Sequence, residues 1–164
     1  MAIYLKKAIK KIEDSDYQTT EIVRDMLNRI RNRGESEVRE LAARFDNWTR
    51  DFVLGKEEIK ALIDKVPQRA KDDIRFAYDQ IYGFAVKQRE SMQEFEAELY
   101  PGVFLGQRLV PCQCTGCYVP GGRFAHAASA IMSVATAKAA GVPFIVACTP
   151  PRGNSINPTV AYAL

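Results

Sequence analysis

The first ninety residues carry apolar side chains at helical spacing. These residues recur three or four positions apart, which is the period of an amphipathic helix. The pattern predicts four helices, from Thr19 or Thr20 to Arg33, Ser36 to Phe45, Lys56 to Val66 and Pro67 to about Met92. In the first helix the expected inward face is Ile22, Val23, Met26, Leu27 and Ile30. In the last it is Ala70, Ile74, Ala77, Tyr78, Ile81, Phe84 and Ala85.

The pattern changes near residue 92, where charged helical sequence gives way to chain rich in Gly, Pro and Val. Residues 95–100 and 103–111 predict two strands around the turn Pro101-Gly102. Gly106 interrupts the second strand and is interpreted as a bulge. We therefore expect a helical N-terminal segment over residues 1–92 and the beginning of an α/β domain over residues 93–164.

The stretch from Cys117 to Pro151 predicts a strand, a glycine turn, a helix and a second strand. An apolar extended run ends at Val119 and is followed by a turn, and residues 126–140 are small and helix-compatible. The apolar run Phe144–Cys148 is typical of a buried parallel strand. This βαβ order places a ligand at the loop after the first strand. The expected fold class is α/β, with an N-terminal helical segment followed by the start of a Rossmann-like parallel α/β domain that is incomplete in this chain.

Composition and charge narrow the classes of partner. The chain has 164 residues and a net charge of +3, which is too small to indicate nucleic-acid binding. No apolar run approaches the roughly 20 residues that a membrane span requires. The N-terminus has lysines but no apolar core of signal-peptide length. We expect a cytoplasmic protein that binds neither membrane nor nucleic acid.

Three cysteines, Cys112, Cys114 and Cys117, form a CxCxxC cluster that could hold a metal. A closed zinc site more often draws its four ligands from two separated pairs. The cluster here lies on an expected strand, and the only histidine, His126, follows the glycine turn. The interpretation we favour is reduced, structural cysteines, so we assign no metal ligand.

The glycine turn also suggests an anion site. Gly121-Gly122 before a helix would leave backbone N–H groups free at the positive end of the helix, with Arg123 and His126 as further donors. The alternative, equally supported, is a tight strand-to-helix turn with no ligand. The dinucleotide fingerprint GxGxxG is absent, so these residues alone do not indicate a nucleotide cofactor.

The segments YVPGG, AKAAGV and CTPP, preceded by FDNW, FAVKQ and PGVFLGQRLVP, occur in this order along nearly the whole chain. In these segments the chain resembles the histidinol dehydrogenase family. The resemblance implies two NAD-dependent oxidation steps from a primary alcohol through an aldehyde to a carboxylate, a zinc ion that orients the substrate, and a homodimer. It places Tyr118 in contact with NAD.

Family members are more than twice as long, so the resemblance implies that this chain is an N-terminal portion and is inactive alone. The zinc ligands and the acid/base pair are expected outside it. We therefore name no catalytic residue and no metal ligand.

One departure from the family pattern bears on the substrate, a small-molecule alcohol. The residues after the turn are Arg123-Phe124-Ala125-His126 and Ala127-Ala128-Ser129, where histidinol dehydrogenases carry smaller or apolar residues and then Pro-Ser. In this the chain is similar to the sulfopropanediol dehydrogenase branch, which oxidises 2,3-dihydroxypropane-1-sulfonate to sulfolactate. Arg123 and His126 would bind the sulfonate. Two alternatives stay open: a histidinol dehydrogenase of histidine biosynthesis, and a non-catalytic dimerisation or binding fragment of such an enzyme.

Overall fold

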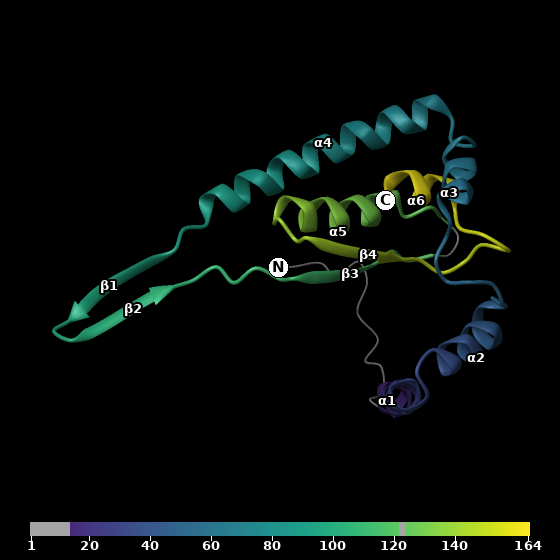
Figure 1. The fold of residues 1–164 in the computed structure, drawn as a ribbon, viewed down its shortest axis with the longest axis horizontal. Coiled ribbons are helices and arrows are strands. Elements are labelled where there is room, and N and C mark those ends of the chain that lie inside the picture. The colour runs from purple at the N-terminus through teal and green to yellow at the C-terminus, as the bar shows by residue number, and fades with distance from the viewer. Residues whose placement is uncertain (1–13, 122–123) are drawn as a thin grey trace, which may run out of the picture. The chain divides into compact units, whose positions relative to one another are not determined.

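The computed structural model describes residues 14–121 and 124–164, which belong to two compact units. The first unit spans Met1–Arg50 and the second Asp51–Leu164. The first contains α1 (Asp14–Arg33) and α2 (Glu35–Asp46). The second contains α3 (Lys56–Ile63), α4 (Gln68–Ser91), β1 (Phe95–Tyr100), β2 (Val103–Gln107), β3 (Cys114–Tyr118), α5 (Ala127–Ala139), β4 (Phe144–Cys148) and α6 (Pro158–Ala163) (Figure 1). No helix in the described part of the chain is long and apolar enough to cross a membrane.

In the first unit, a single residue, Gly34, joins α1 to α2. Its φ of 61° lies in the left-handed region that favours glycine. The Gly34 N–H donates to the Ile30 carbonyl at 2.7 Å, which closes the last turn of α1. At the other end of α2, Asn47 is also left-handed, with φ 52°, and Asn tolerates this conformation better than most residues. These two turns fix the direction in which the chain enters and leaves α2.

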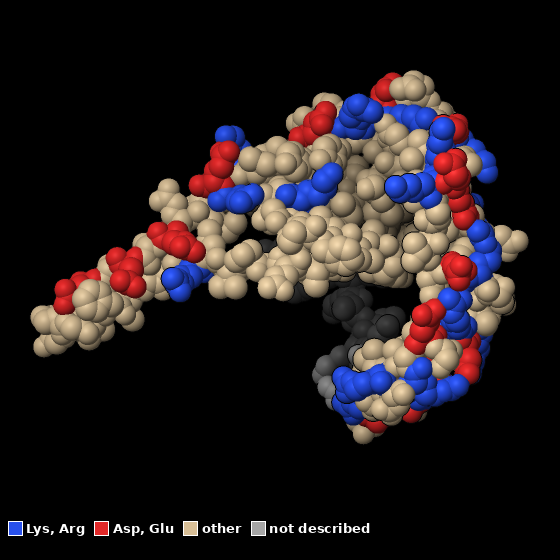
Figure 2. Space-filling view, viewed as in Figure 1, with Lys and Arg blue, Asp and Glu red and all other residues tan. Residues whose placement is uncertain are grey.

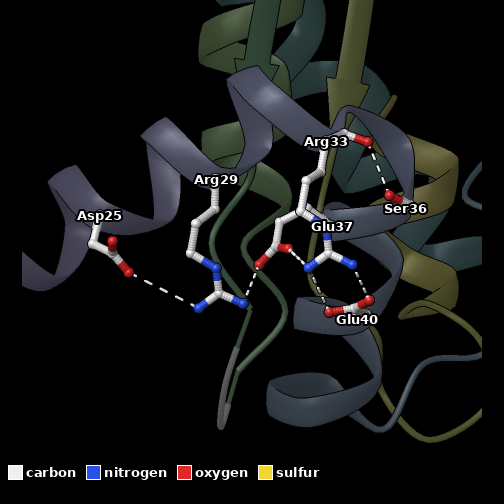
Figure 3. Close-up of polar contacts among 6 residues, drawn as sticks. All are labelled: Asp25, Arg29, Arg33, Ser36, Glu37 and Glu40. Carbon is white, nitrogen blue, oxygen red and sulfur yellow. Dashed lines mark hydrogen bonds and ion pairs between the residues drawn. The ribbon is translucent and has the colours of Figure 1, made fainter.

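A buried carboxylate, Glu37, ties α1 to α2 (Figure 3). Arg33 Nη1 hydrogen-bonds to Glu37 Oε2 at 2.6 Å. Arg29 Nη2 lies 2.5 Å from Glu37 Oε1, in an ion pair that lacks hydrogen-bond geometry. Both arginines come from α1 and are about half exposed, whereas Glu37 comes from the first turn of α2. The carboxylate therefore depends on these two cations for compensation of its lost hydration.

A second ion pair, between Arg33 and Glu40, lies at the exposed edge of the same cluster. Arg33 Nη2 lies 2.5 Å from Glu40 Oε1, and this hydrogen bond holds the pKa of Glu40 below its usual value. The same bond raises the pKa of Arg33. Because the folded pKa of Glu40 is lowered, its stabilising contribution is present above the unfolded pKa and is lost as the pH falls through the folded value.

In the second unit, β3 and β4 pair in parallel and α5 forms the crossover between them (Figure 1). The register runs from Cys114 opposite Phe144 to Tyr118 opposite Cys148. This confirms the βαβ unit that the sequence predicts. The core beside it consists of Val119 and Ala130, which are fully buried, and Val160 of α6 at 2% exposure. The small side chains of α5 let α4 pack along its length.

The Arg89 side chain of α4 donates to the carbonyl of Ala139 at 3.0 Å, near the end of α5. Gly141 follows with φ +80°, and a Cβ at this position would lie 3.3 Å from Arg89 Nη1. The left-handed glycine and the arginine therefore end α5 together.

The expectation that Phe144–Cys148 is a buried strand is wrong. Phe144 is 62% exposed and Val146 is 49% exposed. These residues share one face of the sheet, because strand side chains alternate. Among the described elements only α5 packs against this sheet, so one of its faces is covered and the face with Phe144 and Val146 is open.

Most element boundaries lie within a few residues of those predicted. The strands at 95–100 and 144–148 are confirmed, whereas β2 ends at Gln107 rather than at residue 111. The bulge interpretation of Gly106 is wrong: the register shift lies between Glu98 and Tyr100. Gly106 instead permits close pairing, because a Cβ there would come within 2.2 Å of the Phe95 carbonyl oxygen. The division of the chain near residue 92 stays a prediction.

The predicted apolar stripe of α4 is at least partly buried, except for Phe84, which is 67% exposed. The stripe of α1 differs more. Ile22, Val23 and Leu27 are all about half exposed, and in the described part of the chain α1 packs only against α2.

The antiparallel hairpin of β1 and β2 packs against no other described helix or strand. Its exposed apolar side chains are Phe95, Leu99, Tyr100, Val103, Phe104 and Leu105. Figure 2 shows acidic side chains along the same hairpin. A two-stranded hairpin is marginally stable by itself in water, so these apolar residues are suited to an interface.

Replacement of Glu37 should weaken the first unit. We expect Glu37→Ala to lower the free energy of unfolding by about 1.5–3 kcal/mol, the range for a hydrogen bond to a charged group. Glu40→Ala is the matched control, since its ion pair with Arg33 is exposed to solvent and its loss should weaken the unit much less. Urea denaturation of the full-length protein measures both. Equal small losses would show that the buried position of Glu37 has no special importance.

Candidate functional site

A cavity of about 120 Å³ lies where β3 and β4 end, beyond their carboxyl ends. Its walls are mostly apolar, with three polar side chains among them. The lining residues are Pro120, Gly121, Phe124, Thr149, Pro150, Pro151, Arg152, Asn157 and Val160. In open α/β sheets, ligands bind in the crevice outside the carboxyl ends of the strands.

The loops that follow the two strands pack tightly against each other. A Cβ on Gly121 would lie 2.4 Å from Cγ of Pro150, so a side chain at position 121 cannot be accommodated without movement. The glycine at position 121 is therefore explained by this close approach. Of the two interpretations of the glycine turn, this contact supports the tight turn at Gly121, while Gly122 lies outside the described residues.

The loop after β4 is held by its own backbone bonds. The Arg152 N–H donates to the Ser155 carbonyl at 2.6 Å, across a turn in which Gly153 has φ +64°. Asn157 caps α6, since its side-chain oxygen accepts from the Thr159 N–H at 2.9 Å. Pro158 occupies the first turn of that helix, a position that suits its fixed φ. The cavity wall is therefore formed by structured chain.

Of the site residues predicted from the sequence, the structure describes Tyr118 and His126, and neither lines the cavity. Tyr118 is the last residue of β3 and its side chain is 65% exposed, two positions before Pro120. His126 precedes α5, is half-buried, and makes no side-chain capping bond to the helix. His126 thus occupies the N-cap position of α5, and only its backbone carbonyl bonds to the helix, through the Ala130 N–H. Arg123 lies outside the described residues.

The sequence pattern gives no functional signal for the polar residues of the cavity, Thr149, Arg152 and Asn157. Only their position is informative: Thr149 directly follows a strand that was predicted to be parallel, and Arg152 lies three residues later. Parallel pairing brings the carboxyl ends of β3 and β4 to the same edge of the sheet. The loop after β4 must therefore face the glycine turn after β3.

All four cysteines are free thiols, and only Cys117 is buried. Among the residues that the structure describes, no group of three or more His, Cys, Asp or Glu side chains could hold a metal ion.

A parallel βαβ unit with a cavity at the strand ends defines an α/β protein. The family model for histidinol dehydrogenase matches residues 9–164. The chain belongs to the histidinol dehydrogenase family.

A histidinol dehydrogenase homolog from Pelagibacter ubique is 44% identical over 99% of this chain and 39% of its own length. The sulfopropanediol 3-dehydrogenase of Ruegeria pomeroyi is 46% identical over 98% of this chain and 37% of its own. The crystal structure of histidinol dehydrogenase from Elizabethkingia anophelis has a TM-score of 0.81 and 26% identity, and covers 96% of this chain and 36% of that one. The chain thus spans about two fifths of the length of the curated relatives it matches.

Gly121→Ala should disturb the packing of the two loops. The added methyl group would overlap Pro150, and overpacking of this kind costs about 1–3 kcal/mol of stability. Gly116→Ala is the matched control, because nothing lies within 4 Å of a Cβ at that position of β3, and its effect should be within about 1 kcal/mol. Thermal unfolding of the full-length variants compares the two. If both glycines tolerate alanine equally, the close approach is not maintained in solution.

Proposed function

We propose that the chain forms part of an NAD- and zinc-dependent dehydrogenase, which oxidises a primary alcohol to a carboxylate through an aldehyde. NAD, when bound, accepts a hydride in each of the two steps. The observation that carries the proposal is the cavity at the carboxyl ends of β3 and β4, together with the exposed Tyr118 as the last residue of β3. Membership of the histidinol dehydrogenase family supports it.

The proposed cofactor fits the residues that are present. Tyr118 offers a flat ring for stacking, and the loops after both strands supply apolar walls with polar side chains between them. The cavity of about 120 Å³ is smaller than a dinucleotide, so it would receive one portion of NAD while the rest lies over the exposed strand ends.

We further propose that β3 and β4 begin a Rossmann-like parallel sheet. The open face with Phe144 and Val146 supports this, because parallel sheets normally have both faces covered. Further chain, or a second subunit, would then cover these apolar side chains.

The proposed substrate is 2,3-dihydroxypropane-1-sulfonate, which would be oxidised to sulfolactate. The relative named sulfopropanediol 3-dehydrogenase is 46% identical to this chain, which supports this choice. The half-buried His126 makes no capping bond, so its ring is available as a donor to a sulfonate oxygen. Arg123 is proposed as the second donor, with bonds strengthened by its charge. Histidinol is the second candidate substrate.

A homodimer is proposed as the assembly. The exposed apolar side chains of α1 and of the β1–β2 hairpin support it, since neither group is covered within the described chain. The same surfaces favour the other class of function, a non-catalytic dimerisation or binding module. Reduction of NAD in the presence of the alcohol distinguishes the two classes, because only the dehydrogenase catalyses it.

Tyr118→Ala should raise the Michaelis constant for NAD more than that for the alcohol, because an exposed ring at the end of β3 would lose its contact with the cofactor. Loss of a stacked ring is worth about 1 kcal/mol, which corresponds to roughly fivefold in the constant. Steady-state kinetics with each substrate varied in turn provide the measurement. Equal changes in both constants would indicate that Tyr118 only packs.

Arg123→Met and His126→Ala should selectively weaken use of a sulfonate. Loss of one charge-assisted hydrogen bond lowers kcat/KM by about ten- to a hundredfold. The assay compares dihydroxypropanesulfonate with an uncharged diol of similar size in the full-length enzyme. If kcat/KM falls equally for both substrates, or for neither, these residues do not bind the sulfonate. Histidinol then becomes the better candidate substrate.

A further inference from the structure

The cavity at the ends of β3 and β4 contains one charged side chain, Arg152, among its lining residues. No carboxylate lines this cavity. Arg152 is exposed, and in the described part of the chain no hydrogen bond or ion pair engages its guanidinium. This sets Arg152 apart from Arg29, Arg33 and Arg89, each of which has a partner within the fold.

The backbone holds Arg152 in a defined place at the cavity. Pro150 and Pro151 restrict the chain just before it, and the Arg152–Ser155 backbone bond closes the turn just after it. Pro150 is in turn packed against Gly121 of the opposite loop. The backbone at position 152 is therefore fixed relative to both strand ends.

The chemistry of the lining identifies the ligand group that would fit. Phe124 is 76% exposed, and with the prolines and Val160 it offers apolar surface. The guanidinium of Arg152 offers forked donors that match a tetrahedral oxyanion, and the Thr149 hydroxyl can add another. A ligand with an oxyanion next to a flat apolar portion suits this lining.

We propose that Arg152 binds the phosphates of the dinucleotide. This rests on the proposed NAD-dependent function, because Tyr118 and the cavity lie at the ends of the same two paired strands. Arg152 would thus act in cofactor affinity, at a position distinct from the proposed sulfonate donors Arg123 and His126. The shared chemistry of the two possible ligands is an oxyanion, so the experiment must separate phosphate from sulfonate.

The test measures binding of ADP and of adenosine to the full-length protein by calorimetry, without turnover. Arg152→Met should weaken ADP binding about ten- to a hundredfold, the loss of one charge-assisted hydrogen bond. Adenosine binding should not change, because adenosine has no phosphate. Arg152→Lys should give an intermediate loss, since lysine keeps the charge but not the fork. Arg108→Met is the matched control: Arg108 is exposed and outside the cavity lining, and its replacement should leave both affinities unchanged.

Each outcome decides the assignment. Selective loss of ADP binding in Arg152→Met supports it. Equal ADP binding by wild type and Arg152→Met overturns the assignment of Arg152 and leaves the proposed function standing. A variant that keeps its ADP affinity but loses affinity for dihydroxypropanesulfonate overturns it in favour of a sulfonate site. If wild-type protein binds neither ADP nor NAD, the proposed function fails and the assignment fails with it.

Discussion

The parallel pairing of β3 with β4 is the constraint on which the candidate site depends. Parallel strands require a crossover, which α5 supplies, and both strands must then end at the same edge. The two loops that follow meet there so closely that position 121 has no room for a Cβ beside Pro150. The cavity, the exposed Tyr118 ring and the Arg152 side chain all lie at or next to this edge.

The positions of the helices and strands could be predicted from the sequence, but the burial of some of their side chains could not. Local patterns located the helices and strands, because apolar spacing and turn residues act over a few positions. They failed for the burial of Phe144 and Val146, because an apolar strand looks the same whether one face is covered or two. They also failed at Phe84, where the helical stripe is wider than the surface that α5 and α6 cover.

The site was predictable only in part. Tyr118, Arg123 and His126 all lie in the segment around the glycine turn, whereas the cavity is formed by two loops about thirty residues apart. Thr149 belongs to the CTPP segment and Arg152 directly follows it, but the segment by itself does not indicate a cavity, which becomes visible only when β4 is placed beside β3. Glu37 gave no signal either: a glutamate near the start of a helix normally faces water, and here it is buried between arginines of the preceding helix.

In the proposed function, the edge where β3 and β4 end holds the cofactor. A crystal structure of the full-length protein grown with NAD is the decisive experiment. We expect the dinucleotide to lie over Tyr118 and to enter the cavity between Pro120, Pro150 and Arg152. Density for NAD at another place, with this cavity filled only by water, would contradict it.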